Sequence, residues 1–458
     1  MSLLRRRGIA AAGQGTVPVP ASPYETEVLA DSPSGYWRLG DSGATAVDKA
    51  GSNDGTWSGT YVAEEPGAII DDADTAVRTE TTGTFCNLGQ PHATFSDVTI
   101  ELWFKGGTRE VRQLYSADNG NRSWQFRTTS TGRAEFIKIA GGGVTVTGSR
   151  VVTDGFWHHL AVTYDGANIV LYVDGKVDGE AAATGAIGTA VDLRLGAIPG
   201  SSGDGAIGTY DEAALYDFAL APARVTAHFD EAWSAATADT DLPVTSGLVL
   251  DLDADKITGL TDGDPVTFWP DGSRFDRGAN ALSTGPTYRT NVVNTRPVVR
   301  FDGTAASRLA VPSLELVGGT MFAVVLTTST SIQQVLASRD FNRQLRINGS
   351  AWQLVGAGVP GSPSASGITV DQFHILEARV TDTEVRVAID GGTEAAADST
   401  HGVASYLFDQ IGARGSSFDP LNGDIARLSF YETEMTSTDR DSIRSHLATL
   451  YGITLAGS

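Results

Sequence analysis

Three aspartates spaced two apart, Asp251, Asp253 and Asp255, form the pattern in this sequence that best fits cation binding. Alternate residues of a β-strand point to the same face, so in a strand these carboxylates would repel one another unless a cation offset their charge. An EF-hand calcium loop is excluded, because its sixth position needs glycine and Lys256 stands there. Turn capping and solubility are the alternative roles for these residues.

Motifs of known enzymes are missing from the sequence. Neither G-x-S-x-G nor H-E-x-x-H occurs. Residues 356–361 read GAGVPG and match G-x-G-x-x-G, but a dinucleotide site needs a helix next, and the loop-like SPSASG follows. His158 and His159 are neighbours in a predicted strand, so their side chains point to opposite faces and cannot form one metal pair. We therefore expect the protein not to be an enzyme.

An internal repeat sets the domain organisation. FWHHLAVTYDGANIVLYVDG at 156–175 matches FHILEARVTDTEVRVAIDG at 373–391, with Asp174 and Asp390 216 positions apart. Other segments match in the same order with nearly the same offset: 121–126 with 342–347, 193–197 with 409–413, and 208–220 with 422–435. The sequence therefore predicts an N-terminal tail at 1–21, one domain at 22–236, a linker at 237–243 and a second copy at 244–458.

The strand pattern within each copy predicts an all-β fold. Apolar residues alternate in ANIVLYVDG at 167–175 and in TEVRVAIDG at 383–391, and the Asp-Gly pairs that end both segments predict tight turns. Comparable patterns predict strands at 98–105, 123–129, 134–139, 157–165, 320–328 and 425–431. Short, regularly spaced strands are typical of antiparallel sandwiches and barrels.

Each copy is predicted to end in one short helix. In the first copy Pro222 suits a first helical turn, and apolar residues recur every four positions at Val225, Phe229 and Trp233. In the second copy Thr436 and Asp439 resemble the start of a capping box, followed by the apolar stripe Ile443, Leu447 and Leu450. Both helices are expected to pack on the sandwich in a structural role.

Composition excludes several classes of function. The net charge is -22, which argues against non-specific nucleic-acid binding and against docking on anionic membranes. No apolar run is long enough to insert into a membrane, and the single cysteine, Cys86, excludes an internal disulfide framework. Arg5, Arg6 and Arg7 are not followed by the apolar core of an export signal. We expect them to belong to a docking tail.

The segment SPSGYWRLGDSGATAVDKAGSNDGTWSGTY at 32–61 resembles the opening of laminin-G-like domains, which are concanavalin A-like jelly rolls. IELWFK, FWHHLAVTYDG, LYVDGK and YDEAALYDFALAPARV continue the resemblance through the first copy, while the second copy is more diverged. The resemblance implies two tandem antiparallel β-sandwich jelly rolls. The absence of an export signal, the acidic composition and the basic tail make the chain similar to the minor tail proteins of actinophages.

The resemblance also implies candidate binding residues. Similar modules often hold a structural calcium between an early loop and the last strand, which would be held here by Asp41 with Asp211 and by Asp251 with Asp424. Trp57 and Trp269 lie near turns and are the expected exposed platforms for sugar rings. Glycoside hydrolases of this fold use paired acids. Glu101 has no acidic counterpart in the second copy, so an inherited catalytic pair is not expected.

The expected function is a non-enzymatic structural and adhesion component of a phage virion. The jelly rolls would face host-surface glycans or neighbouring tail proteins, with Arg5, Arg6 and Arg7 docking the chain on the tail. Assembly would take place in the host cytoplasm. Many similar tail proteins are trimers, but the sequence itself does not indicate an oligomeric state. Two alternatives stay open: a glycan-binding module of a bacterial surface or secreted protein, and a capsid-decorating protein of the same fold.

Overall fold

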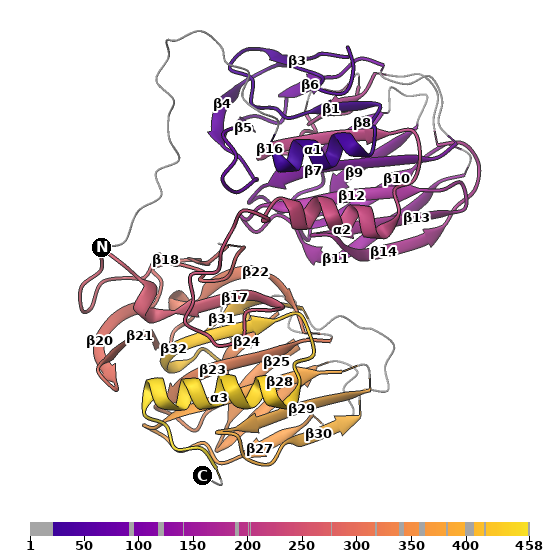
Figure 1. Cartoon of the computed structure of the whole chain (residues 1–458). Helices are drawn as coiled ribbons and strands as arrows, with labels where there is room; N and C mark the ends of the chain where they lie inside the picture. Colours follow the sequence, from indigo (N-terminus) through magenta and orange to yellow (C-terminus); the bar gives the residue numbers. More distant parts are fainter. Residues whose placement is uncertain are drawn as a thin grey trace. The chain divides into compact units, whose positions relative to one another are not determined.

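The computed structural model divides the chain into two compact units, one ending at Ala236 and one beginning at Thr237, here called domain one and domain two. Each domain is described by itself (Figure 1). The structure describes residues 22–90, 96–117, 123–140, 142–187, 192–199, 201, 203–275, 277–316, 318–338, 343–356, 362–381, 383–398, 407–415 and 418–456. Arg5, Arg6 and Arg7 lie outside these residues.

Domain one contains two antiparallel sheets. The first has the order β14 (Lys176–Ala182), β13 (Asn168–Val173), β12 (His158–Tyr164), β7 (Val98–Lys105), β16 (Thr209–Tyr216), β5 (Thr75–Thr79) and β4 (Tyr61–Pro66), with β1 (Gly35–Trp37) also paired to β16. The second has the order β11 (Val144–Val151), β10 (Arg133–Lys138), β9 (Trp124–Thr128), β8 (Arg112–Ala117), β15 (Arg194–Leu195), β6 (Phe85–Asn87), β3 (Gly55–Ser58) and β2 (Thr45–Ala46).

Domain two repeats this strand order. Its first sheet runs β30 (Ala395–Asp398), β29 (Glu384–Ile389), β28 (Phe373–Val380), β23 (Thr320–Thr327), β32 (Asn422–Tyr431), β21 (Arg296–Asp302) and β20 (Thr287–Val293), with β17 (Leu248–Asp253) also paired to β32. Its second runs β27 (Ser364–Ser366), β26 (Ala351–Gly356), β25 (Arg343–Asn348), β24 (Gln333–Ala337), β31 (Leu407–Ile411), β22 (Leu309–Glu315), β19 (Ala279–Ala281) and β18 (Phe268–Trp269). The expected fold class, two tandem antiparallel jelly rolls, is confirmed.

The two faces of each first sheet have different partners. In β7, Ile100, Leu102 and Phe104 join a buried cluster that also includes Leu114 and Phe126 of the second sheet, so these residues fill the interior of the sandwich. The intervening residues of β7 therefore point to the opposite face, because side chains alternate along a strand. Helices cover that outer face in each domain (Figure 1).

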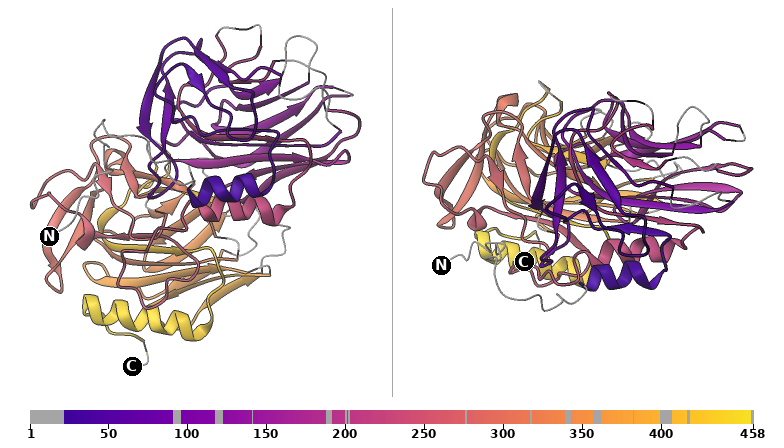
Figure 2. Two further views of the ribbon diagram at one scale, coloured as in Figure 1. Left: turned by 45° about the horizontal axis from the view of Figure 1, so that its top comes forward. Right: turned by 90° about the horizontal axis from the view of Figure 1, so that it is seen from above.

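The helices on the outer faces are α1 (Pro23–Ala30), α2 (Pro222–Glu231) and α3 (Ser437–Tyr451). Figure 2 shows α1 and α2 side by side on domain one. The predicted helices α2 and α3 are confirmed, with Pro222 in the first turn of α2 and the Thr436 side chain accepting the Asp439 N–H at the start of α3. Helix α1 was not predicted, because only Tyr24 and Val28 of its residues are buried and no apolar stripe marks it.

The tight turns predicted at the two Asp-Gly pairs are confirmed. Asp174 and Gly175 have φ angles of 53° and 72°, and Asp390 and Gly391 have 51° and 71°. Both residues of a type I′ turn need positive φ, which Asp and Gly tolerate better than other residues. Domain two also contains the 3-10 turns Ala254–Lys256 and Ala305–Ser307, and isolated bridges, such as the one between Trp37 and Asp48 in domain one, add further pairs. Within the described residues, no helix has the length and apolar character of a membrane span.

Candidate functional site

The two tryptophans predicted to stack on sugars are buried, so that prediction is wrong. Trp57 is 5% exposed and Trp269 is 0% exposed. Both lie in short strands whose residues alternate between the core and solvent, and each indole takes the inward position. In β18 the outward position belongs to Phe268, which is 44% exposed. Proximity to a turn therefore did not indicate exposure.

In domain two, Asp251 and Asp424 do not form the predicted calcium pair. Asp251 lies opposite Ser429 of β32, and Asp424 is five residues earlier on that strand, roughly 16 Å away at the usual strand rise. Each carboxylate is already bound by a guanidinium. Asp251 accepts hydrogen bonds from Arg427 at 2.8 and 2.6 Å, and Asp424 accepts two from Arg300 at 2.7 Å. In both places an arginine side chain supplies the positive charge that was expected from calcium.

In domain one, Asp211 lies in an acidic cluster with different partners from those predicted. Carboxylate oxygens of Asp74, Asp211 and Glu212 lie within 4.8 Å of one another, as a metal site would require. Asp41 does not belong to this group, and its Oδ2 accepts the Val47 N–H at 2.9 Å. The Oδ2 of Asp211 accepts the Ala68 N–H at 2.7 Å, while its buried Oδ1 has no hydrogen-bond partner.

Arg38 is the cation nearest to this acidic cluster. Its guanidinium donates to Glu212 at 3.0 and 2.8 Å and forms an ion pair with Asp74 at 3.2 Å. Burial raises the pKa of Glu212 to about 7 and that of Asp74 to about 6, although Arg38 opposes both changes. Burial, followed by repulsion from Glu212, also raises the pKa of Asp211. One guanidinium therefore does not fully compensate the three carboxylates.

The two domains use ion pairs of opposite polarity at the same place in the fold. Both last strands, β16 and β32, contain a bulge where they pass the end of the first strand of the domain. In domain one, Arg38 follows β1 and binds Glu212 at the bulge. In domain two, Asp253 ends β17 and lies 3.3 Å from Arg427 at the bulge. In each copy a charge pair joins the first strand to the last. The arginine belongs to the first strand's end in domain one and to the last strand in domain two.

A buried carboxylate also anchors the helix layer of domain one. Glu101 of β7 points to the outer face, where its oxygens lie 3.2 Å from Nε2 of His159 and 3.1 Å from Nδ1 of His228 on α2. The Tyr216 hydroxyl donates to Glu101 at 2.8 Å. Burial lowers the pKa of His228, but attraction to Glu101 outweighs it and raises the pKa overall. Glu101 thus ties β7, β12, β16 and α2 together in a structural cluster.

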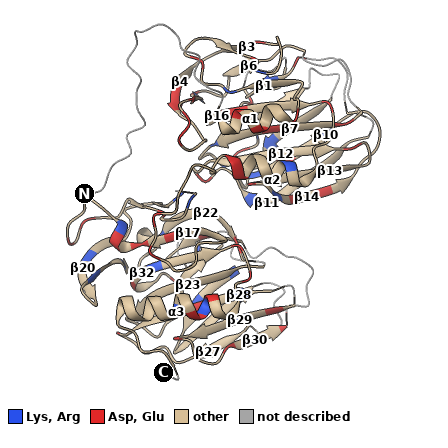
Figure 3. Ribbon diagram, in the orientation of Figure 1, with Lys and Arg blue, Asp and Glu red and all other residues tan. Residues whose placement is uncertain are grey.

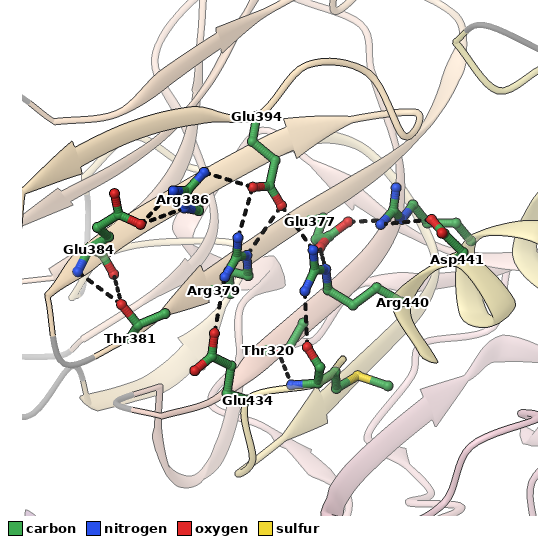
Figure 4. A network of polar contacts seen from close by, with 12 residues as sticks. Thr320, Glu377, Arg379, Thr381, Glu384, Arg386, Glu394, Glu434, Arg440 and Asp441 are labelled. Carbon is green, nitrogen blue, oxygen red and sulfur yellow. Dashed lines mark hydrogen bonds and ion pairs between the residues drawn. The ribbon is translucent and has the colours of Figure 1, made fainter. Parts of the chain in front are cut away.

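Domain two anchors α3 through arginines instead of histidines. Glu377 of β28 lies 3.0 Å from Nε of Arg440 and 3.2 Å from Nε of Arg444, both on α3. Figure 3 shows the charged stretch of α3 in blue and red, and Figure 4 shows Arg440 between Glu377 and Glu394. Arg379 joins Glu394 at 2.8 Å. Neither anchor was predicted from the sequence, although an acid inside an apolar strand, as in IELWFK, indicates a buried carboxylate that needs a partner.

A His–Asp pair recurs in both copies. Nδ1 of His158 lies 3.1 Å from Asp174, and Nδ1 of His374 lies 2.6 Å from Asp390 at the matching turn. His158 has a second carboxylate, because its Nε2 lies 3.0 Å from Asp154. Burial alone would lower the pKa of His158, but Asp154 and Asp174 outweigh it and raise this pKa to about 10. As predicted from the strand period, His159 points to the other face, toward Glu101.

We expect domain one to lose stability as pH rises from about 6.5 to 10. The folded-state pKa of His158 is raised above the unfolded value of about 6.5, so its stabilisation is complete below that value and disappears as pH passes through 10. Thermal unfolding at several pH values, read by hydrogen exchange of domain-one peptides, measures this. His158→Gln should flatten the alkaline slope, whereas the control His446→Gln on α3 should retain it. An equal slope in His158→Gln would contradict the assignment.

Comparisons with known proteins concern the fold. The chain is similar to domain 4 of AbnA, an extracellular arabinanase from Geobacillus stearothermophilus, in complex with arabinotriose (17% identity, TM-score 0.36, 43% of this chain and 98% of that one). It is also similar to mouse laminin alpha1 domains LG4-5 (13% identity, TM-score 0.25, 92% and 93%) and to the binding domain of botulinum neurotoxin DC in complex with SialylT (9%, 0.38, 83% and 94%).

Residues 80–226 match the model of a family described as the concanavalin A-like lectin/glucanases superfamily. No curated protein matches the chain significantly. The matched residues begin directly after β5 and end within α2, and so include β7, β12 and β16, the strands that Glu101 ties together. Domain one has a lectin/glucanase fold.

Proposed function

We propose that this protein is a non-enzymatic adhesion protein that binds carbohydrates through its jelly-roll domains. The match of residues 80–226 to the concanavalin A-like lectin/glucanase family carries this proposal. Of the two activities in that description, carbohydrate binding fits the side chains better. Glycoside hydrolysis needs two carboxyl groups facing an open cleft. Glu101, Glu212 and Glu377 are instead buried, and each is bound by histidine or arginine.

The biological setting that we propose is a phage virion. The chain would be a minor tail protein, made and assembled in the host cytoplasm, with Arg5, Arg6 and Arg7 docking it on other tail proteins and the jelly rolls contacting host glycans as a trimer. The resemblance of the sequence to actinophage tail proteins supports this setting. A bacterial surface glycan-binding module and a capsid-decorating protein are the alternatives.

Immunogold labelling of purified virions separates these possibilities. Gold at the tail tip supports the tail-protein proposal, gold on the capsid supports decoration, and unlabelled particles contradict both.

Carbohydrate binding and catalysis are tested together on one set of samples. The labelled full chain is applied to an array of bacterial surface polysaccharides and oligosaccharides, and the same polysaccharides are assayed for release of reducing sugar after incubation with the chain. We expect binding to at least one carbohydrate and no release of reducing sugar. Release of reducing sugar would overturn the non-enzymatic proposal, and no binding anywhere on the array would overturn carbohydrate recognition.

We also propose a structural calcium in domain one alone. Asp74, Asp211 and Glu212 offer closely spaced carboxylate oxygens, the ligands that calcium prefers, and the unpartnered Oδ1 of Asp211 gives one of them a free acceptor. Calcium would share Asp74 and Glu212 with Arg38. In domain two, by contrast, both oxygens of Asp251 and both oxygens of Asp424 already accept hydrogen bonds from arginine.

We expect millimolar calcium to raise the melting temperature of domain one and a chelator to lower it, since an ion that binds only the folded state stabilises it. Asp211→Asn should abolish the response, while the matched control Asp217→Asn, at the residue directly after the end of β16, should preserve it. Differential scanning calorimetry with and without chelator is the measurement. An unchanged melting temperature would contradict calcium binding by domain one.

A further inference from the structure

The outer face of domain two has a hollow of about 450 Å³ beyond the end of the helix layer. Four of its residues form a row across adjacent strands: Arg300 of β21 is opposite Asp424 of β32, which is opposite Leu326 of β23, which is opposite Phe373 of β28. Residues opposite one another in a sheet point to the same face, so all four side chains border one surface. Thr328 and Asn422 border it as well.

Arg300 and Asp424 form a rigid polar fork in this hollow. Nε and Nη2 of Arg300 donate to the two oxygens of Asp424, both at 2.7 Å, and the Asp424 side chain is 2% exposed while that of Arg300 is 42% exposed. The bidentate contact leaves Nη1 of Arg300 free to donate, and each carboxylate oxygen keeps a lone pair. The fork therefore presents donors and acceptors in one plane, which suits two neighbouring hydroxyl groups.

Phe373 supplies an apolar surface at the other end of the row. Its ring is partly exposed, whereas the next residue with the same orientation, Ile375, is buried under α3. Trp157 of domain one occupies the matching position, since it precedes His158 as Phe373 precedes His374. This residue is also aromatic and partly exposed. An aromatic face beside a planar polar fork matches a sugar ring, which has one apolar face and hydroxyl groups around its edge.

We propose that this hollow binds a neutral saccharide, with its ring over Phe373 and two neighbouring hydroxyl groups on Arg300 and Asp424. The charge of the lining excludes anionic sugars, since Asp424 compensates Arg300 and Asp371 adds a further negative charge. Domain one lacks the fork: Thr209 stands opposite Arg78, which pairs with Glu65 and Glu80 instead. This proposal rests on the proposed carbohydrate-binding function and assigns it to one surface of domain two.

The test uses the full chain and defined sugars. Maltotriose, cellotriose, mannotriose and arabinotriose are examined by saturation-transfer-difference NMR, with 3′-sialyllactose as the anionic comparison. We expect at least one neutral trisaccharide to bind and 3′-sialyllactose to bind at least tenfold more weakly. Phe373→Ala and Asp424→Asn should each weaken binding at least tenfold, because one removes the stacking surface and the other an acceptor of the fork.

Matched controls distinguish a lost site from a lost fold. Phe268→Ala removes another exposed phenylalanine of domain two, and Asp398→Asn neutralises an exposed aspartate on β30, at the far edge of the same sheet. Both should bind as the unchanged chain does, and circular dichroism should show that all four variants are folded at the temperature of the binding measurement. Saccharide binding that survives both Phe373→Ala and Asp424→Asn would overturn the hollow as the site while leaving carbohydrate recognition intact. No binding of any sugar here or on the polysaccharide array would overturn both.

Discussion

Replacing Arg427 with methionine should lower the stability of domain two by about 3–5 kcal/mol, because it leaves buried carboxylates without their cation. Arg427 is 1% exposed and binds Asp251 through two hydrogen bonds. It also donates to Asp241 at 2.6 Å and lies 3.3 Å from Asp253. For a domain of this size the loss corresponds to a fall in melting temperature of roughly 10 °C. Calorimetry of the full chain, with hydrogen exchange to assign the transition to domain two, measures it.

Two further variants make the Arg427 result specific. Arg289→Met removes a more exposed arginine from the same sheet, where it pairs with Asp262 at 3.4 Å, and should cost less than about 1 kcal/mol. Arg427→Met combined with Asp251→Leu should recover part of the loss, since removing both charges of a buried pair costs less than removing one. If Arg427→Met is no more destabilising than Arg289→Met, the charge pair does not hold the first strand to the last.

Glu101→Gln should destabilise domain one by about 3–5 kcal/mol and loosen α2 first. The fully buried carboxylate accepts from Tyr216 and lies against His159 and His228, so an amide cannot replace all three contacts. Attraction to the two imidazoles lowers the pKa of Glu101 despite its burial, so at neutral pH the native cluster carries the charge that glutamine lacks. Hydrogen exchange should show faster opening of the α2 peptides than in the unchanged chain.

The control for this variant is Glu110→Gln, which removes a half-exposed acid paired with Arg112 in the same domain. Surface pairs of this kind contribute about 1 kcal/mol or less, so its melting temperature should stay close to that of the unchanged chain. Six of the eight tryptophans lie in domain one, and tryptophan fluorescence therefore follows its unfolding. Equal unfolding curves for Glu101→Gln and Glu110→Gln would show that Glu101 is not an anchor.

Local patterns predicted much of the fold. The strand predicted at 98–105 is β7 as observed, and the Asp-Gly turns and the helices α2 and α3 also lie where alternation, proline and capping residues placed them. These features depend on residues close together in the sequence. Helix α1 is different, because its own sequence pattern does not indicate a helix. It is held by long-range contacts, such as the hydrogen bond that the Tyr24 hydroxyl accepts from Trp103.

The candidate sites were predicted less well, because they depend on distant partners. Glu101 and His228 are 127 residues apart, and Asp251 and Arg427 are 176 apart, so neither pairing follows from spacing. The D-x-D-x-D pattern correctly indicated a need for positive charge at Asp251 and Asp253, but the charge comes from an arginine on another strand. Aligning the acids of the two copies could not reveal that the polarity of the pair is reversed between them.

A crystal structure of the full chain with a bound neutral trisaccharide tests the central claim most directly. We expect a sugar ring over Phe373, with neighbouring hydroxyl groups within hydrogen-bond distance of Arg300 and Asp424. A saccharide bound elsewhere on the protein, with no ligand on the row from Arg300 to Phe373, would contradict the proposed site.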